Sequence, residues 1–204
     1  MPDAHEGKEG KETKPIIPEL SVAASRGTYV AACAELGCLP VSRVVRNLGA
    51  TSISLRHYGI GARGTVALAE GLRVSANVRR LDLSSNNIGV EGGLAVGELL
   101  QRTQRIHSVD VSSNKIASGA ASIAEALAHH GGLRELILRN NAIDPEAAKV
   151  FGRVGLCASK CRLLRLDLAE NKLDDGAAVA LARGLAENCS LVRLDLSWNR
   201  VGHR

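Results

Sequence analysis

One phrase, LDLSSNNI at residues 81–88, decides the fold of this chain. Four further copies follow it as VDVSSNKI (109–116), LILRNNAI (136–143), LDLAENKL (166–173) and LDLSWNRV (194–201). A sixth version, ISLRHYGI (53–60), precedes it and has Tyr58 where the others have asparagine. Equivalent positions are 28, 28, 27, 30 and 28 residues apart, and a period of this length predicts a stack of structural repeats.

Each phrase predicts a short strand that ends at its asparagine. Leu81 and Leu83 alternate with Asp82 and Ser84, as in a strand with one buried face. The asparagine side chain carries both an acceptor and donors, so it can bond the backbone of its own turn and of the neighbouring coil. We therefore expect an internal asparagine ladder, made of Asn86, Asn114, Asn141, Asn171 and Asn199.

After each strand the apolar spacing becomes helical, as Ile88, Val96 and Leu100 show in the second unit. The helices of the first three units are expected to begin at glycines: Gly64, Gly92 and Gly119. One unit is therefore a strand, a turn, a helix and a return loop. No unit can bury its own apolar side, but stacked units share one continuous core.

Residues 50–201 resemble the ribonuclease-inhibitor-like class of leucine-rich repeats, whose pattern begins L-x-x-L-x-L-x-x-N-x-I-G. The segment before and inside the first repeat is similar to the leucine-rich repeat-containing protein 74 family at Pro40, Val41, Ser42, His57, Tyr58, Gly59, Gly61 and Gly64. The resemblance implies an α/β fold, a right-handed leucine-rich repeat solenoid or horseshoe. Six parallel strands would line its concave face, and the helices would lie on its convex face.

Composition divides the chain into three segments. Residues 1–20 are charged and contain prolines, and we expect a disordered tail there. Residues 21–49 are expected to form a helical cap, and residues 50–204 the repeat domain, with about five full repeats and a truncated sixth. No apolar run of transmembrane length and no secretory leader are readable, so no membrane partner is expected.

The chain has an odd number of cysteines: Cys33, Cys38, Cys157, Cys161 and Cys189. Cys157 and Cys161 have no second pair of ligands nearby in the sequence, so we expect no metal and no cofactor. Cys161 and Cys189 occupy equivalent positions of adjacent units, which suggests small apolar fillers of the return loops. Together with the missing leader, this favours a reducing, cytoplasmic compartment.

The segment GIGARG (59–64) has the form of a dinucleotide-binding motif. The repeat explains it better, because its glycines return one unit later as Gly89 and Gly92. No nucleophile and base lie at catalytic spacing, and His129 and His130 are expected at a helix end, where imidazolium suits the dipole. We therefore expect no catalytic residues and no enzyme. The alternative is a regulator of a small GTPase, since repeats of this class include a GTPase-activating protein.

The net charge of +5 is spread over the molecule. Outward strand positions form three columns: Arg80, Ser108, Glu135, Arg165 and Arg193; then Asp82, Asp110, Ile137, Asp167 and Asp195; then Arg56, Ser84, Ser112, Arg139, Ala169 and Ser197. Their charges nearly cancel, so the excess positive charge lies on helices and return loops. The few aromatic residues offer no stacking platform, and nucleic acid is not an expected partner.

The aspartate column has two interpretations. Lateral pairs with Arg80, Arg165 and Arg193 would make it an ordinary solvated surface. Alternatively, the columns form a recognition surface in the C-terminal half, made of Ile137, Arg139, Arg165, Asp167, Arg193, Asp195 and Trp198. Exposed Ile, Arg and Trp on a rigid concavity are residue types that anchor protein interfaces. We predict a non-enzymatic adaptor or scaffold that binds a protein partner on this face.

The last phrase is not followed by the helix that every earlier unit supplies. Leu194 and Leu196 are expected to point inward, with nothing covering their outer side. Two expectations follow from this. Either the chain is the N-terminal part of a longer repeat protein, such as a larger leucine-rich repeat receptor, or it associates with itself end to end through residues 194–201.

Overall fold

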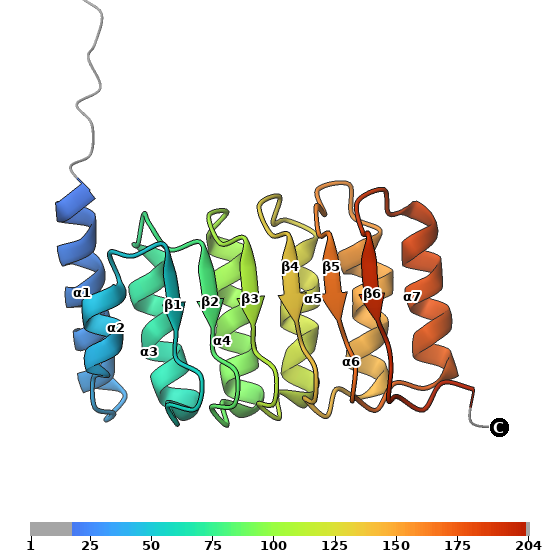
Figure 1. Ribbon diagram of the computed structural model, residues 1–204, viewed down its shortest axis with the longest axis horizontal. Coiled ribbons are helices and arrows are strands. Elements are labelled where there is room, and N and C mark those ends of the chain that lie inside the picture. Colours follow the sequence, from blue (N-terminus) through green and yellow to red (C-terminus); the bar gives the residue numbers. More distant parts are fainter. Residues whose placement is uncertain (1–17, 203–204) are drawn as a thin grey trace, which may run out of the picture.

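The computed structural model describes residues 18–202, which wind into a right-handed solenoid (Figure 1). Within these residues, six strands form one parallel sheet in chain order: β1 (Ser52–Ser54), β2 (Arg80–Asp82), β3 (Ser108–Asp110), β4 (Glu135–Ile137), β5 (Arg165–Asp167) and β6 (Arg193–Asp195). Neighbouring strands pair in the register of the repeat, so Leu81 lies beside Val109, and Val109 beside Leu136. The predicted α/β solenoid is confirmed.

Helices form a layer behind the strands in Figure 1. Their bounds are α3 (Gly61–Arg73), α4 (Gly89–Arg102), α5 (Ala120–Leu127), α6 (Pro145–Val150) and α7 (Asp175–Glu187). Two of them adjoin a helical segment of another type. The 3-10 helix η1 (Ala117–Gly119) leads into α5, and the π-helix η2 (Phe151–Leu156) extends α6. The strand side of the solenoid is called the concave face below. It comprises the outward strand residues and the residues two and three positions after each strand.

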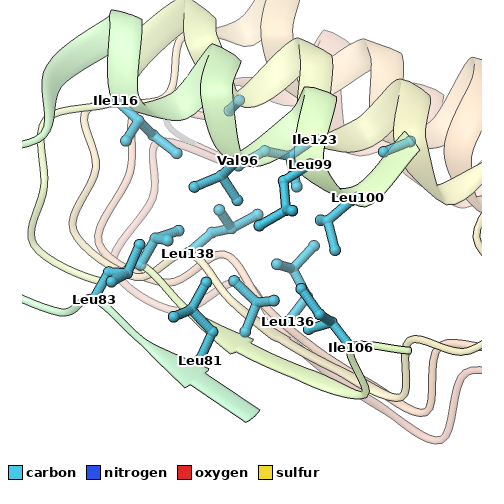
Figure 2. Close-up of a cluster of buried hydrophobic side chains, with 14 of the residues drawn as sticks. Leu81, Leu83, Val96, Leu99, Leu100, Ile106, Ile116, Ile123, Leu136 and Leu138 are labelled. Atoms are coloured by element: carbon cyan, nitrogen blue, oxygen red, sulfur yellow. The ribbon is translucent and has the colours of Figure 1, made fainter. Parts of the chain in front are cut away.

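Leucine, isoleucine and valine side chains fill the space between the two layers. Figure 2 labels ten of them from successive coils: Leu81, Leu83, Val96, Leu99, Leu100, Ile106, Ile116, Ile123, Leu136 and Leu138. All are buried, and strand side chains point toward helix side chains. Burying one such side chain contributes about 1.5–3 kcal/mol. The stacking of units therefore supplies the stability that a single unit lacks.

The helices begin in two different ways. In the first three units the helical segments begin at Gly61, Gly89 and Ala117, and each of these residues has a positive φ. In the last two units Asp144 and Asp174 cap the helix, and each carboxylate accepts a backbone N–H at 2.8 Å. The predicted starts at Gly64, Gly92 and Gly119 are therefore wrong by two or three residues. Gly92 lies inside α4, where a Cβ would collide with Ile88.

The longest step of the repeat, from Asn141 to Asn171, contains η2. A π-helix uses more residues per turn than an α-helix, so it takes up the extra length while β5 stays in register with β4. A Cβ at Gly152 would lie only 2.0 Å from the carbonyl oxygen of Ala180 in α7. The close contact between these two coils therefore requires glycine there.

Helices α1 (Pro18–Glu35) and α2 (Ser42–Asn47) form the cap at the N-terminal end. α1 packs on α3, and the buried phenol of Tyr29 accepts a hydrogen bond from the Val41 N–H at 2.9 Å. α1 begins at Pro18, inside the segment predicted as a tail, and the remainder of that segment lies outside the described residues. None of the described helices is long and apolar enough to cross a membrane.

Candidate protein-binding surface on the concave face

Two ion pairs join adjacent coils in the C-terminal half of the concave face. Glu135 on β4 accepts hydrogen bonds from Arg165 on β5 at 2.8 Å and from Ser108 on β3 at 2.9 Å. Arg139, just after β4, pairs with Glu170, just after β5. Because all four charged side chains are partly exposed, each pair adds about 1 kcal/mol or less to stability. Their charged groups remain within reach of a partner.

The aspartates of the concave face bind their own turns. Oδ1 of Asp82 accepts from the N–H and the hydroxyl of Ser84, and Oδ2 accepts from the hydroxyl of Ser54. Asp110 and Asp195 likewise accept the N–H two residues further on. Among the described residues, no salt bridge joins these aspartates to an arginine. The predicted lateral Arg–Asp pairing is therefore wrong.

These contacts favour the ionised forms of Asp82 and Asp195. Partial burial alone would raise the pKa of Asp82, but the hydrogen bonds from its serine neighbours and the positive charge of Arg56 outweigh it and lower the pKa. Hydrogen bonds from Ser197 lower the pKa of Asp195, and the charges of Arg139 and Arg193 add to this. Arg139 and Arg193 therefore lie close enough to Asp195 to favour its ionised form.

The predicted contact residues differ in how far a partner can reach them. Trp198 is 81% exposed, and Arg193 is exposed and forms no salt bridge with any described residue. Ile137 is half-buried. Asp167 is only 7% exposed, and its Oδ1 accepts the N–H of Ala169 at 3.0 Å. The structure therefore leaves Asp167 least available for contact.

Trp198 occupies a fixed place in its loop. Its φ is 58°, and a positive φ recurs at the equivalent position of every coil, in His57, Ser85, Ser113, Asn140 and Glu170. A residue other than glycine adopts this conformation only where the surrounding structure imposes it. The indole is therefore presented to solvent from a defined backbone.

The asparagine side chains bond successive coils to one another. Nδ2 of Asn114 donates to two carbonyls of its own coil and to the carbonyl of Leu83 in the preceding coil. Its Oδ1 accepts the N–H of Asn86 in that coil at 2.8 Å. In the first unit Tyr58 occupies the position of the asparagine. Its ring lies beside Arg43, whose guanidinium carbon is 5.6 Å from the ring centre.

A second set of polar side chains, in the return loops, was not predicted from the sequence. Oδ1 of Asn188 accepts the N–H groups two and three residues further on. Nδ1 of His130 does the same in its own loop, at 3.1 and 2.9 Å. Both residues lie six positions before the first strand leucine of their units. This shared position is the sequence feature from which their common role in the return loops could have been predicted.

His130 is therefore neutral, and its predicted role as an imidazolium at a helix end is wrong. The side chain is 1% exposed, and burial lowers its pKa to about 4. Because Nδ1 accepts hydrogen bonds, the ring proton resides on Nε2. That nitrogen is buried and has no hydrogen-bond partner among the described residues.

Arginines of the return loops hold loop carbonyls. Nη1 of Arg79, of Arg134 and of Arg162 each donates to the carbonyl three residues earlier. Arg105 also donates across to the carbonyl of Ser75 in the preceding return loop. The arginines that give these loops their positive charge therefore stabilise the loop backbone.

The cysteines are unpaired thiols. Cys161 is buried as an apolar filler, whereas the equivalent Cys189 is exposed, so the filler interpretation holds for Cys161 alone. Within residues 18–202, no group of three or more His, Cys, Asp or Glu side chains is placed to hold a metal ion.

Comparisons with known proteins agree with this geometry. A family model described as a leucine-rich repeat matches residues 74–97, 160–182 and 187–203. The chain contains leucine-rich repeats. A solved structure described as leiomodin-1 actin-binding site 2 is similar in fold, with a TM-score of 0.53 and 17% sequence identity, covering 85% of this chain and 92% of that chain. Leucine-rich repeats indicate a protein–protein interaction module, and their extended concave surface is the usual contact.

Proposed function

We propose that this protein is a non-enzymatic adaptor or scaffold that binds a protein partner on the C-terminal half of its concave face. The observation that carries the proposal is the surface from β4 to β6. There, half-buried Ile137 lies on the same sheet as two inter-coil ion pairs, and Arg193 and Trp198 are exposed. Interface hot spots are enriched in Trp and Arg that become desolvated on binding.

The charges on this surface favour a particular kind of contact. Arg193 lies beside Arg165 in the strand register, and Glu135 already neutralises Arg165. A carboxylate from a partner would therefore find Arg193 without a competing ion pair. Trp198, five residues further along the same coil, would supply exposed apolar area, so the fitting partner carries both an acidic residue and an apolar one.

A capture experiment with three variants tests this proposal. Arg193→Glu and Trp198→Ala change the concave face. Arg63→Glu makes a matched charge reversal at an exposed position of α3. We expect each concave variant to weaken binding of a captured partner about tenfold or more, equivalent to about 1.4 kcal/mol or more. Arg63→Glu should bind like the wild type. A partner that binds all three variants equally would place the interface elsewhere.

Further parts of the proposal concern context. We place the protein in the cytoplasm, which its free thiols favour, and we expect no nucleic-acid partner. The narrower relation to the leucine-rich repeat-containing protein 74 family is a hypothesis that rests on Pro40, Val41 and Ser42 and on the first repeat. A captured GTPase whose hydrolysis rate rises on binding would instead favour the alternative role as a GTPase regulator.

A further inference from the structure

Helix α1 ends in a turn whose two closing positions are both cysteines. The N–H of Gly37 donates to the carbonyl of Ala34 at 3.3 Å, and the N–H of Cys38 donates to the carbonyl of Cys33 at 2.9 Å. Gly37 has a φ of 62°, as the left-handed residue of such a turn requires. This is the Schellman motif, which places the first and last residues of the hydrogen-bonded ring near each other and is frequently accompanied by contact between their side chains.

The Cys38 thiol lies close enough to Cys33 to affect its pKa. Cys33 also interacts with the phenol of Tyr29 inside the cap. Cys33 is fully buried, and burial raises its pKa to about 11, so it is protonated at neutral pH. Cys38 is partly exposed at the rim of the same cluster. A reagent in solution therefore meets Cys38 first.

We propose that Cys33 and Cys38 form a reversible disulfide by exchange with a low-molecular-weight disulfide such as oxidised glutathione. Cys38 loses its proton to solvent, and its thiolate attacks one sulfur of the reagent. The reagent's S–S bond breaks, and one reduced thiol leaves. The buried Cys33 then attacks the sulfur of Cys38, and its proton passes to the departing thiolate, which leaves as the second reduced thiol. Two protein thiols are oxidised, and the two sulfurs of the reagent are reduced.

The other accessible thiols lack this arrangement. Sγ of Cys157 lies 3.1 Å from the carbonyl oxygen of Arg153, and Sγ of Cys189 lies 3.8 Å from that of Glu187. Neither thiol has a hydrogen bond to a second thiol, so we expect exchange there to stop at the mixed disulfide. Exposed Cys189 therefore serves as the internal control for the cap pair.

Peptide mapping of the full chain after treatment with oxidised glutathione at mildly alkaline pH tests the proposal. Trypsin cleaves after Arg26 and Arg43, so both cysteines fall in the peptide of residues 27–43. A protease specific for glutamate cuts this peptide after Glu35, between them. We expect the wild-type peptide to lose the mass of two hydrogens, retain no glutathione, and stay joined after that cut until a reductant is added.

Two variants separate the steps. Cys33→Ala should accumulate glutathione on Cys38, because the second thiol is gone. Cys38→Ser, at a partly exposed position, should leave residues 27–43 unmodified. Wild-type protein that retains glutathione on Cys38 as Cys33→Ala does would overturn the proposal. So would a wild-type cap pair that stays reduced while Cys189 is modified, or a bond from Cys38 to any other cysteine.

Discussion

At the scale of single residues, the solenoid depends on side chains that bond two coils at once. Nδ2 of Asn114 and Nδ2 of Asn199 both donate to carbonyls of their own and of the preceding coil. Asn114 is fully buried and its Oδ1 accepts two N–H groups of the preceding coil, whereas Asn199 is partly exposed and its Oδ1 accepts one, that of Leu173. We predict that Asn114→Ala costs about 3 kcal/mol of unfolding free energy, and Asn199→Ala about 1 kcal/mol. Urea denaturation measures both. Equal losses would contradict the dependence on neighbouring coils.

His130 makes stability depend on pH. Its pKa is about 4 in the folded state and 6.5 ordinarily, so between these values the unfolded chain binds more protons. Stability contributed by neutral His130 is therefore complete above pH 6.5 and falls as the pH drops toward 4. We predict a loss of up to about 3 kcal/mol across this window, measured from urea midpoints.

The control for this effect is His130→Asn, since Asn188 already caps the equivalent loop with its side-chain oxygen. The variant keeps an acceptor for the two loop N–H groups and removes the titrating ring. Its stability should change less than that of the wild type between pH 6.5 and 4. An unchanged pH dependence in the variant would assign the acid sensitivity to other groups.

At the scale of elements, the helices pack closely because glycine occupies the contact points. A Cβ on Gly184 of α7 would lie 2.3 Å from the carbonyl oxygen of Gly152 in η2. We predict that Gly184→Ala costs about 1–3 kcal/mol through overpacking. A Cβ on Gly27 of α1 would meet no neighbouring segment within 4 Å, so Gly27→Ala should gain up to about 1 kcal/mol from helix propensity. If both substitutions changed the free energy of unfolding in the same direction, the space around each glycine would not decide its effect on stability.

At the scale of the whole molecule, protection should differ between the interior coils and β6. The N–H groups of Leu168 and Glu170 donate to the next coil at 2.9 Å, whereas those of Leu196 and Trp198 have no backbone acceptor within residues 18–202. We predict that the amides of Leu196 and Trp198 exchange hydrogen much faster than those of Leu168 and Glu170. Exchange monitored by NMR measures this difference.

End-to-end association through residues 194–201, expected from the sequence, stays a prediction that the same experiment tests. Arg43 of α2 donates to the carbonyl of Ser54 in β1, which occupies part of the sheet edge at the opposite end. Self-association would therefore use β6, and the protection of Leu196 would rise with protein concentration. Slow exchange of that amide at every concentration, with a monomer in sedimentation, would contradict it.

The sequence by itself determined the repeat, the strands and the buried leucines. These features follow from local periodicity: Leu81 and Leu83 alternate with polar residues, and the same pattern returns about every 28 residues. A nearly constant spacing forces equivalent residues side by side, and the strand register matches it in every pair. The C-terminal half of the concave face was predicted in the same way, as outward positions of the strands.

Only the tertiary structure decided which polar groups meet. Arg165 pairs with Glu135 of the preceding coil, and Asp167 turns to its own backbone, although the sequence places Arg165 and Asp167 two positions apart on one face. His130 became a buried, neutral loop cap for the same reason. The energy of a charged or polar group depends on burial and on partners that belong to the next coil, about 30 residues away in the chain. Periodicity brings the coils together, but the side-chain contacts between them choose the partners.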